Sequence, residues 1–262
     1  MKSMYLGSGD VANLMTGMQT KSQANLMRKF VSDDIPYYNA KASPIDAFRA
    51  GAILEERYGL ILSDAYYPQV RKKSTEMDVF RCSLDFAKIE NSKIVDFEEL
   101  KTVNFNDFID NLEPLRNDHA AGIELIKKTY KKYYNQIQQQ LYCTELDSAT
   151  MTFLAVYSYE DEVNYTRDIK TNEYIKFRIQ RDEDVIAKIK SRGALYQQIK
   201  DAFTIPEKKQ SKTKQIKPQE KEPEEQLQEQ AQDNTITPEI EESPVNEPKI
   251  EEKKIFTQKI DF

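Results

Sequence analysis

The sequence predicts an α/β protein: a mixed (α+β) sheet flanked by helices on both faces, followed by a disordered C-terminal tail. Two observations predict the core. Apolar residues recur at helical spacing in some segments and alternate with polar residues in others, and these segments run in the order helices, strands, long helix, strands, last helix. A third observation predicts the tail, because Lys, Glu, Gln and Pro dominate from Pro206 onward.

The tail segment is too polar to bury the apolar surface that would offset its chain entropy. We therefore expect residues 1–205 to form one domain and residues 206–262 to be disordered. The tail holds 14 acidic and 10 basic residues, so it carries −4 of the chain's net charge of −6 and leaves about −2 for the domain. Because the domain has so little net charge, any contact with nucleic acid must come from a local patch of basic residues.

Capping residues and apolar spacing predict the helices. The best-marked helix begins at Pro44 after the candidate N-cap Ser43 and ends before Gly59. The other expected helices are a short one between Ser8 and Gly17 and the segments 22–31, 119–142 and 181–203.

Alternating and β-branched patterns predict the strands. A turn at 90–93 should join the second and third strands as neighbours. The expected strands cover residues 60–66, 77–89, 93–103, 150–160 and 172–180.

Several classes of site are excluded by composition. Cys82 and Cys143 form no CxxC, which excludes a cysteine-ligated zinc or cluster site and suggests two buried thiols in a reducing compartment. His119 is the single histidine, so the sequence does not favour a catalytic site in which histidine activates a Ser or Cys nucleophile. The sequence has neither a signal peptide nor an apolar run of membrane-spanning length, and we expect a cytoplasmic protein without a membrane segment.

The stretch IVDFEELKT, residues 94–102, places an acid and a base on one face of a strand, because Glu99 and Lys101 are two residues apart. The hairpin can bring Asp85 beside them. Two carboxylates, the Leu100 carbonyl and water suit Mg²⁺ or Mn²⁺, while the ammonium of Lys101 can stabilise a phosphate oxygen. The pattern predicts phosphodiester hydrolysis; the alternative is a chance cluster in a charged protein.

Two helices carry further candidates. Glu55 or Glu56 can supply a third acid, and periodicity does not choose between them; they could instead be an exposed acidic pair. Gln138 and Tyr142 lie one turn apart on the long helix, where they could orient the site or contact a DNA phosphate. The alternative there is a solvated Gln-rich helix.

In the order RAGAILEERY, SLDFAKI, VDFEELKT and YYNQIQQQLYCT, these motifs resemble the PD-(D/E)xK nucleases of the phage lambda exonuclease and YqaJ-like recombinase type, over about residues 5–203. The family's Gly-x-x-x-Glu helix matches Gly51 and Glu55, which selects Glu55. The remaining matches are Asp85, Glu99 and Lys101 for the core motif and Gln136, Gln138 and Thr144 for the Gln-rich helix.

The resemblance implies a restriction-endonuclease-like core and a Mg²⁺-dependent exonuclease, with Mn²⁺ as a substitute. It further implies a ring-shaped homo-oligomer that degrades one strand of duplex DNA from a 5′ end. The expected partner is a single-strand annealing or single-strand-binding protein.

The sequence departs from the family pattern in places. Phe86 replaces a glycine, and Asn106 stands where the family has a phosphate-holding arginine. Lys2 and Ser8, just before the first helix, are the remaining candidates to hold a terminal phosphate. Nuclease chemistry is therefore better supported than end recognition.

Apolar residues return at the tip of the tail in KKIFTQKIDF. Ile255, Phe256, Ile260 and Phe262 could form a docking peptide for a replication or annealing partner, or the tail could be a polar leftover. Two other functions stay open: a structure- or sequence-dependent endonuclease, and a non-catalytic DNA-binding or replisome scaffold protein.

Overall fold

The computed structural model describes residues 4–17, 19–31, 44–159 and 162–203. These residues fall within one compact unit. The predicted tail and the candidate cap Ser43 lie outside the described residues.

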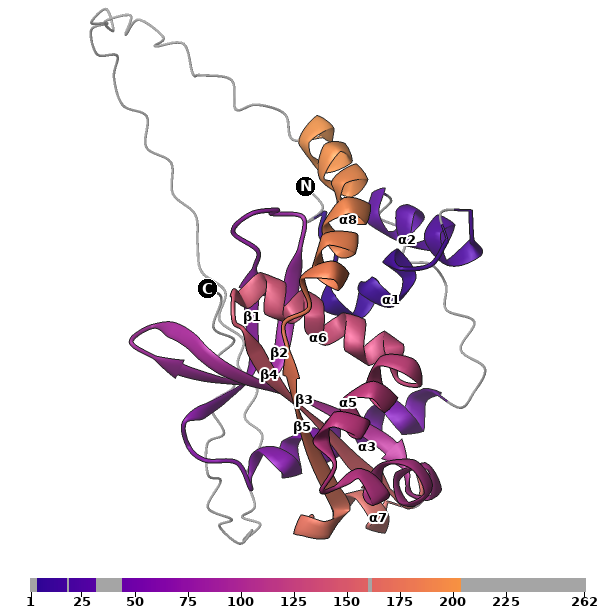
Figure 1. The fold of residues 1–262 in the computed structure, drawn as a ribbon, viewed down its shortest axis with the longest axis vertical. Coiled ribbons are helices and arrows are strands. Elements are labelled where there is room, and N and C mark those ends of the chain that lie inside the picture. Colours follow the sequence, from indigo (N-terminus) through magenta and orange to yellow (C-terminus); the bar gives the residue numbers. More distant parts are fainter. Residues whose placement is uncertain (1–3, 18, 32–43, 160–161, 204–262) are drawn as a thin grey trace, which may run out of the picture. The chain divides into compact units, whose positions relative to one another are not determined.

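A five-stranded sheet forms the centre of the unit, in the order β1-β2-β3-β4-β5. Strands β3 and β4 are parallel and all other neighbours are antiparallel, so the predicted mixed sheet is confirmed (Figure 1). The strands are β1 Tyr66–Lys73, β2 Arg81–Glu90, β3 Lys93–Asn104, β4 Ser148–Val156 and β5 Tyr174–Gln180.

The predicted β2–β3 hairpin is confirmed, and its turn has two residues. Asn91 and Ser92 have φ angles of 51° and 60°. Two-residue turns with positive φ at both positions follow the right-handed twist of the strands they join, which explains the tight connection. The register pairs Glu90 with Lys93 at the turn.

The parallel β3–β4 pair needs a crossover, since parallel neighbours cannot be joined by a tight turn. The crossover is helical, and its segments are α4 Phe105–Asp107, η2 Phe108–Leu112, η3 Glu113–Leu115, α5 His119–Lys128 and α6 Lys131–Thr144.

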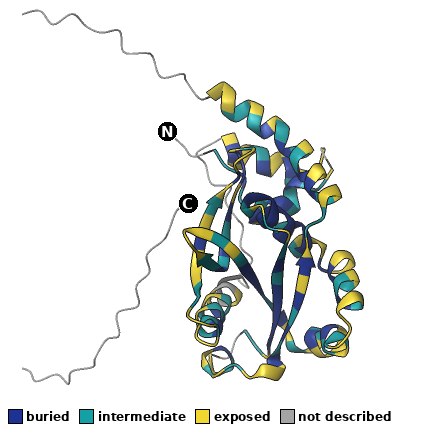
Figure 2. Cartoon of the chain, turned by 60° about the vertical axis from the view of Figure 1, so that its left-hand side comes forward, coloured by how far each residue is buried: buried dark blue, intermediate teal, exposed yellow. Residues whose placement is uncertain are grey.

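The prediction of one long helix over 119–142 was wrong, because the helix breaks at Tyr130. Its hydroxyl donates to Asp107 at 2.6 Å and its ring packs 5.0 Å from that of Phe153. These tertiary contacts turn the chain, and Tyr130 leaves the helical conformation at ψ 33°. The new helix, α6, buries most of its residues against the sheet (Figure 2).

Helices cover both faces of the sheet, as predicted. On one face α6 packs with α5, α8 and the N-terminal helices around Phe97 and Phe153. On the other, α3 packs Leu54 and Tyr58 against Phe86. The remaining helices are η1 Ser8–Asp10, α1 Val11–Leu14, α2 Lys21–Val31, α3 Pro44–Gly59, α7 Val163–Thr166, η4 Thr171–Glu173 and α8 Glu183–Phe203.

The strand predicted at 60–66 was also wrong. The N–H groups of Leu60, Ile61 and Leu62 donate back to the last turn of α3, so this segment continues the helix as turns. The strand that follows, β1, is rich in polar and charged residues and contains Pro68. Such a composition suits its place at the edge of the sheet and hid it from an apolar pattern.

Among the described residues, no helix combines the length and the apolar character needed to cross a membrane.

Candidate active site

Strands β2 and β3 separate after the pair Phe86–Glu98. Beyond this pair, β1 is the only strand of the described sheet that pairs with β2, and β4 is the only one that pairs with β3. We call this opening the fork. Asp85 and Glu99 flank it on the two strands, and the Leu100 N–H donates to Asp85 Oδ2 at 2.9 Å.

Glu99 lies at the centre of the candidate site and is 1% exposed. Its Oε1 accepts hydrogen bonds from Lys101 Nζ at 2.6 Å and from Gln136, and its Oε2 accepts one from Gln140 at 2.6 Å. The structure thus brings together the three residues that the hairpin and the strand period predicted, namely Asp85, Glu99 and Lys101.

The helix acid that faces this group is Glu55. Gln69 of β1 donates from Nε2 to Glu55 Oε1 and accepts at Oε1 from Ser83 Oγ, 3.2 Å away. Glu56, the alternative, is exposed. Gln69 has a φ of 54°, a left-handed backbone conformation that residues other than glycine rarely adopt.

The acids of the site disfavour one another's ionisation. Burial, followed by the charge of Glu99, raises the pKa of Asp85 well above its ordinary value. Burial also raises the pKa of Glu55, against the hydrogen bond from Gln69. Burial alone would lower the pKa of Lys101, but Glu99 and Asp85 outweigh it and the pKa is raised. Lys101 therefore stays protonated, and among the described residues it is the cation that bonds to this group of acids.

The glutamines of α6 hold the fork open. Gln139 and Gln140 donate to the backbone carbonyls of Arg81 and Ser83, which β3 no longer pairs. Gln140 thereby links both arms of the fork, since it also donates to Glu99. Sequence reasoning missed Gln140, although its i,i+4 spacing from Gln136 places the two amides on one helix face.

Gln138 and Tyr142 do not join the site. Gln138 is fully buried; its amide donates to the Gln180 carbonyl and its Oε1 accepts from the Asp182 N–H. Tyr142 is buried, with its ring edge-on to Phe80. Both have structural partners instead of the exposed face expected for a DNA contact.

The other predicted residues lie apart from Glu99. Ser8 is buried in η1, and Thr144 Oγ1 donates to the Gln140 carbonyl at the end of α6. Asn106 is exposed at the start of α4. Lys2 and the tail residues Ile255, Phe256, Ile260 and Phe262 lie outside the described residues.

A second charged group lies on the opposite face of β3. Glu98 is 3% exposed among apolar residues, and it accepts hydrogen bonds from Tyr58 of α3 and from Thr152, and one at 3.0 Å from Lys176. Adjacent strand residues face opposite sides, so the pair Glu98-Glu99 had to direct one acid to each face.

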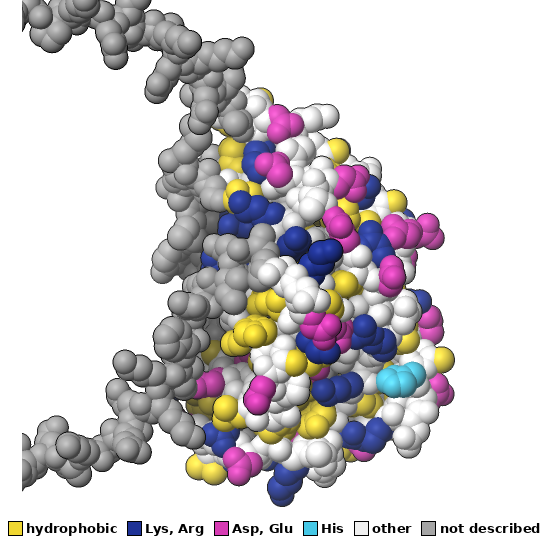
Figure 3. All heavy atoms as spheres, turned by 90° about the vertical axis from the view of Figure 1, so that its left-hand side faces the viewer, with side chains coloured by type: hydrophobic (Ala, Val, Ile, Leu, Met, Phe, Trp, Pro, Cys, Tyr) yellow, Lys and Arg dark blue, Asp and Glu magenta, His cyan; other side chains and the backbone are white. Residues whose placement is uncertain are grey.

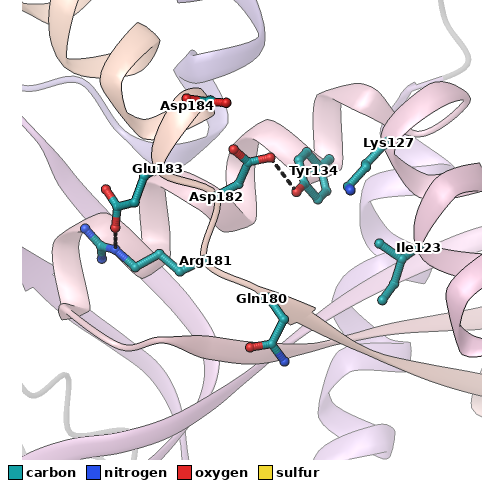
Figure 4. A pocket seen from close by; sticks show the side chains of 8 residues that line it. All are labelled: Ile123, Lys127, Tyr134, Gln180, Arg181, Asp182, Glu183 and Asp184. Atoms are coloured by element: carbon teal, nitrogen blue, oxygen red, sulfur yellow. Dashed lines mark hydrogen bonds and ion pairs between the residues drawn. The ribbon is translucent and has the colours of Figure 1, made fainter.

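A pocket of about 540 Å³ lies between α5, α6 and the start of α8 (Figure 4). None of Glu55, Asp85, Glu99 or Lys101 lines it. Its charged groups largely satisfy one another, since Tyr134 donates to Asp182 and Arg181 pairs with Glu183. We therefore place the candidate site at the fork.

No protein-family model matches the sequence, and no curated protein is significantly similar to it. Solved structures are similar. A phage-related exonuclease from Haemophilus somnus 129PT superposes with a TM-score of 0.50 at 16% identity, over 78% of this chain and 98% of that one. The chain has the fold of that phage-related exonuclease. An alkaline exonuclease from Laribacter hongkongensis gives a TM-score of 0.49 at 18% identity, over 76% and 88% of the two chains.

The restriction-endonuclease-like fold implied by the sequence resemblance is thereby confirmed. In the described part of the chain, no group of three or more His, Cys, Asp and Glu side chains is arranged to hold a metal ion. A metal at the fork would thus depend on two carboxylates together with backbone and water oxygens.

Proposed function

We propose that this protein is a metal-dependent DNA exonuclease that hydrolyses one strand of linear duplex DNA from the 5′ end. The observation that carries the proposal is the convergence of Asp85, Glu99 and Lys101 at the fork. The fold shared with a phage-related exonuclease supports it.

The donor set at the fork fits a divalent cation of the Mg²⁺ type. Asp85 and Glu99 offer carboxylate oxygens, the Leu100 carbonyl is a further donor, and hard oxygen ligands are what Mg²⁺ and Mn²⁺ prefer. The pKa of Asp85 is raised first by burial and then by the charge of Glu99, and Lys101 does not offset the two. A bound cation would offset that charge, and it would polarise the phosphate and acidify a water molecule.

The protein's own groups supply the rest of the chemistry. Lys101, held protonated, can donate hydrogen bonds to a phosphate oxygen as negative charge develops there. Gln136 and Gln140 donate to the two carboxylate oxygens of Glu99 and fix its orientation. The carboxylate therefore needs little reorientation to bind a cation. Glu55, which accepts a hydrogen bond from Gln69, can accept a proton or position water.

The deciding experiment follows nucleotide release from linear duplexes labelled at the 5′ or the 3′ end, with Mg²⁺ or Mn²⁺, beside a closed circular duplex. We expect early release of the 5′ label, no cleavage of circles and no activity in chelator. Nicked circles would indicate an endonuclease instead, and the absence of any cleavage would indicate a DNA-binding scaffold.

We further propose that the active form is a ring-shaped homo-oligomer that binds duplex ends, and that residues 250–262 dock a single-strand annealing or single-strand-binding protein. Light scattering measures the first. Pull-downs with and without residues 250–262 test the second, and equal recovery of the partner would exclude a docking role for the tip.

A further inference from the structure

Three exposed cations lie on one surface of the β1–β2 hairpin: Arg71, Lys73 and Arg81. Lys73 is directly opposite Arg81 in the register, and Arg71 is opposite Ser83. Like charges directly opposite one another destabilise a strand pair. Within the ranges that the structure describes, none of the three forms an ion pair with an acidic side chain. We call these three residues the cationic row.

At the end of the row farther from Asp85, cationic side chains lie around one aromatic ring. Around the ring of Tyr5 lie Arg81 at 4.6 Å, Lys73 at 5.3 Å and Lys200 at 4.2 Å. Asp78 pairs with Lys200 at 2.8 Å, and the pKa of Asp78 is lowered by hydrogen bonds from Lys200 and Gln197 and by the charges of Lys200 and Lys73. Three cationic side chains thus surround one aromatic ring at this end of the row.

The near end of the row reaches the candidate active site. Ser83, opposite Arg71, donates to Gln69, and Gln69 donates to Glu55. Alternation along β2 places Arg81 and Ser83 on the same side as Asp85. Asp85 is four steps along the strand from Arg81, a span of about 13 Å.

Protection of a sheet edge is the simpler explanation for lysines on β1, because charged edges prevent strand pairing between molecules. It does not account for Arg81, because the Leu6 carbonyl and the Gln139 amide already bond the backbone N–H and carbonyl of Arg81. It does not account for the cations around Tyr5 either. Figure 3 shows acidic and basic side chains interspersed over one face, so the molecule does not present that face as uniformly basic. The cationic row, which forms no ion pair within the described ranges and lies beside the fork, fits a local anionic partner.

We propose that the cationic row binds the phosphates of duplex DNA adjacent to the scissile phosphodiester. The inference rests on the proposed nuclease function and deepens it by assigning a substrate path. Each DNA strand advances about 3.4 Å per nucleotide along the helix axis, so a row of about 13 Å would reach phosphates within about four nucleotides of the cut.

The test measures binding of the full chain to a labelled linear duplex by fluorescence anisotropy in chelator, over a range of salt concentrations. Each phosphate contact contributes about 0.9 to the slope of log K against log salt. The combined variant Arg71→Gln, Lys73→Gln, Arg81→Gln should flatten the slope by about two to three. A matched control removes three exposed cations elsewhere, as Arg28→Gln, Lys93→Gln and Lys128→Gln, and should keep the wild-type slope.

Position is tested with duplexes that carry uncharged methylphosphonates two to four nucleotides from the end. They should weaken wild-type binding and leave the combined variant unchanged. Thermal melting checks folding, and the single variants Arg71→Gln and Arg81→Gln serve if the combined one is unstable.

A wild-type slope in the combined variant, an equal loss in the control, or a wild type that does not bind DNA would each overturn the row as a DNA path. These outcomes are distinct from failure of the proposed function. If the salt slope depends on the cationic row but the protein does not cleave DNA in Mg²⁺, the DNA-binding surface is supported and the nuclease function is rejected. If the protein cleaves DNA but the combined variant has the wild-type slope, the nuclease function is supported and the cationic row is rejected.

Discussion

The carboxyl group of Asp85 is ionised at a cost, because burial and Glu99 raise its pKa. An acid whose folded-state pKa exceeds its unfolded value lowers stability as pH rises from the unfolded pKa, about 3.9, through the folded one. Asp85→Asn removes this cost and keeps an acceptor for the Leu100 N–H. We expect its melting temperature in chelator to equal or exceed that of the wild type, by a margin that grows with pH, while cleavage falls by roughly 100-fold or more.

Lys101→Ala is the contrasting control for Asp85→Asn. It removes the cation that bonds to this group of acids, so it should lower the melting temperature as well as the rate. Melting curves between pH 4 and 9 in chelator, and initial rates in Mg²⁺, separate the two variants. An Asp85→Asn variant that melts well below the wild type at pH 8 would contradict this electrostatic account.

Gln69 combines a strained backbone with a contact to Glu55. Its φ of 54° costs about 1–3 kcal/mol in a residue other than glycine. Gln69→Gly relieves the strain but removes the donor to Glu55, so stability should rise while the rate falls. Ser92→Gly at the hairpin turn, with a φ of 60°, is the matched control.

Ser92→Gly should raise stability at an unchanged rate, because Ser92 has no contact with the fork among the described residues. Urea unfolding and initial rates are measured for both variants. If Gln69→Gly cleaves as fast as Ser92→Gly, Gln69 does not position Glu55.

At the scale of elements, some glutamines of α6 have a structural role and others contact the candidate active site. Gln138 bonds to the connection between β5 and α8, whereas Gln140 bonds to both arms of the fork. Each change to alanine leaves buried partners unsatisfied and should cost about 1–3 kcal/mol. Only Gln140→Ala should also lower the rate per folded molecule, and an equal loss of rate in Gln138→Ala would refute the division.

The polar cluster around Glu98 attaches α3 to the sheet. Tyr58→Phe removes a donor to a buried carboxylate and should destabilise the fold by about 1.5–3 kcal/mol, the range for hydrogen bonds to charged groups. Tyr67→Phe is the control, since Tyr67 is 44% exposed. If urea unfolding gives the two variants equal stability, the hydrogen bond from the Tyr58 hydroxyl to Glu98 does not stabilise the fold.

The sequence predicted the elements whose signal is local. The hairpin turn, the strand carrying Glu99 and the helix α3 were predicted because period and turn chemistry act within a few residues. The break at Tyr130 and the edge strand β1 were missed, since the first depends on contacts with Asp107 and Phe153 and the second carries few apolar residues. At the site, Asp85, Glu99 and Lys101 follow from the hairpin register, whereas Gln69 and Gln140 depend on the packing of elements far apart in the chain.

For the whole molecule, the open question is how a DNA end is distinguished from the interior of a duplex. A terminal 5′-phosphate carries extra charge that a fixed cation can recognise. The sequence resemblance predicts that Asn106 stands where nucleases of the lambda exonuclease type have an arginine. Asn106 is exposed just after β3, the strand that carries Lys101. Ser8, the other described candidate, is 7% exposed and poorly available to DNA.

We therefore expect a weak dependence on the 5′-phosphate in the wild type and a stronger one in Asn106→Arg. A hydrogen bond to a charged group is worth about 1.5–3 kcal/mol, which corresponds to roughly 10- to 150-fold in rate preference. Initial rates are compared on 5′-phosphorylated and 5′-hydroxyl linear duplexes, with Asn111→Arg, one turn or more beyond, as a control for added charge. A wild-type preference above about 100-fold that Asn106→Arg does not change would mean that the terminal phosphate is held elsewhere on the molecule.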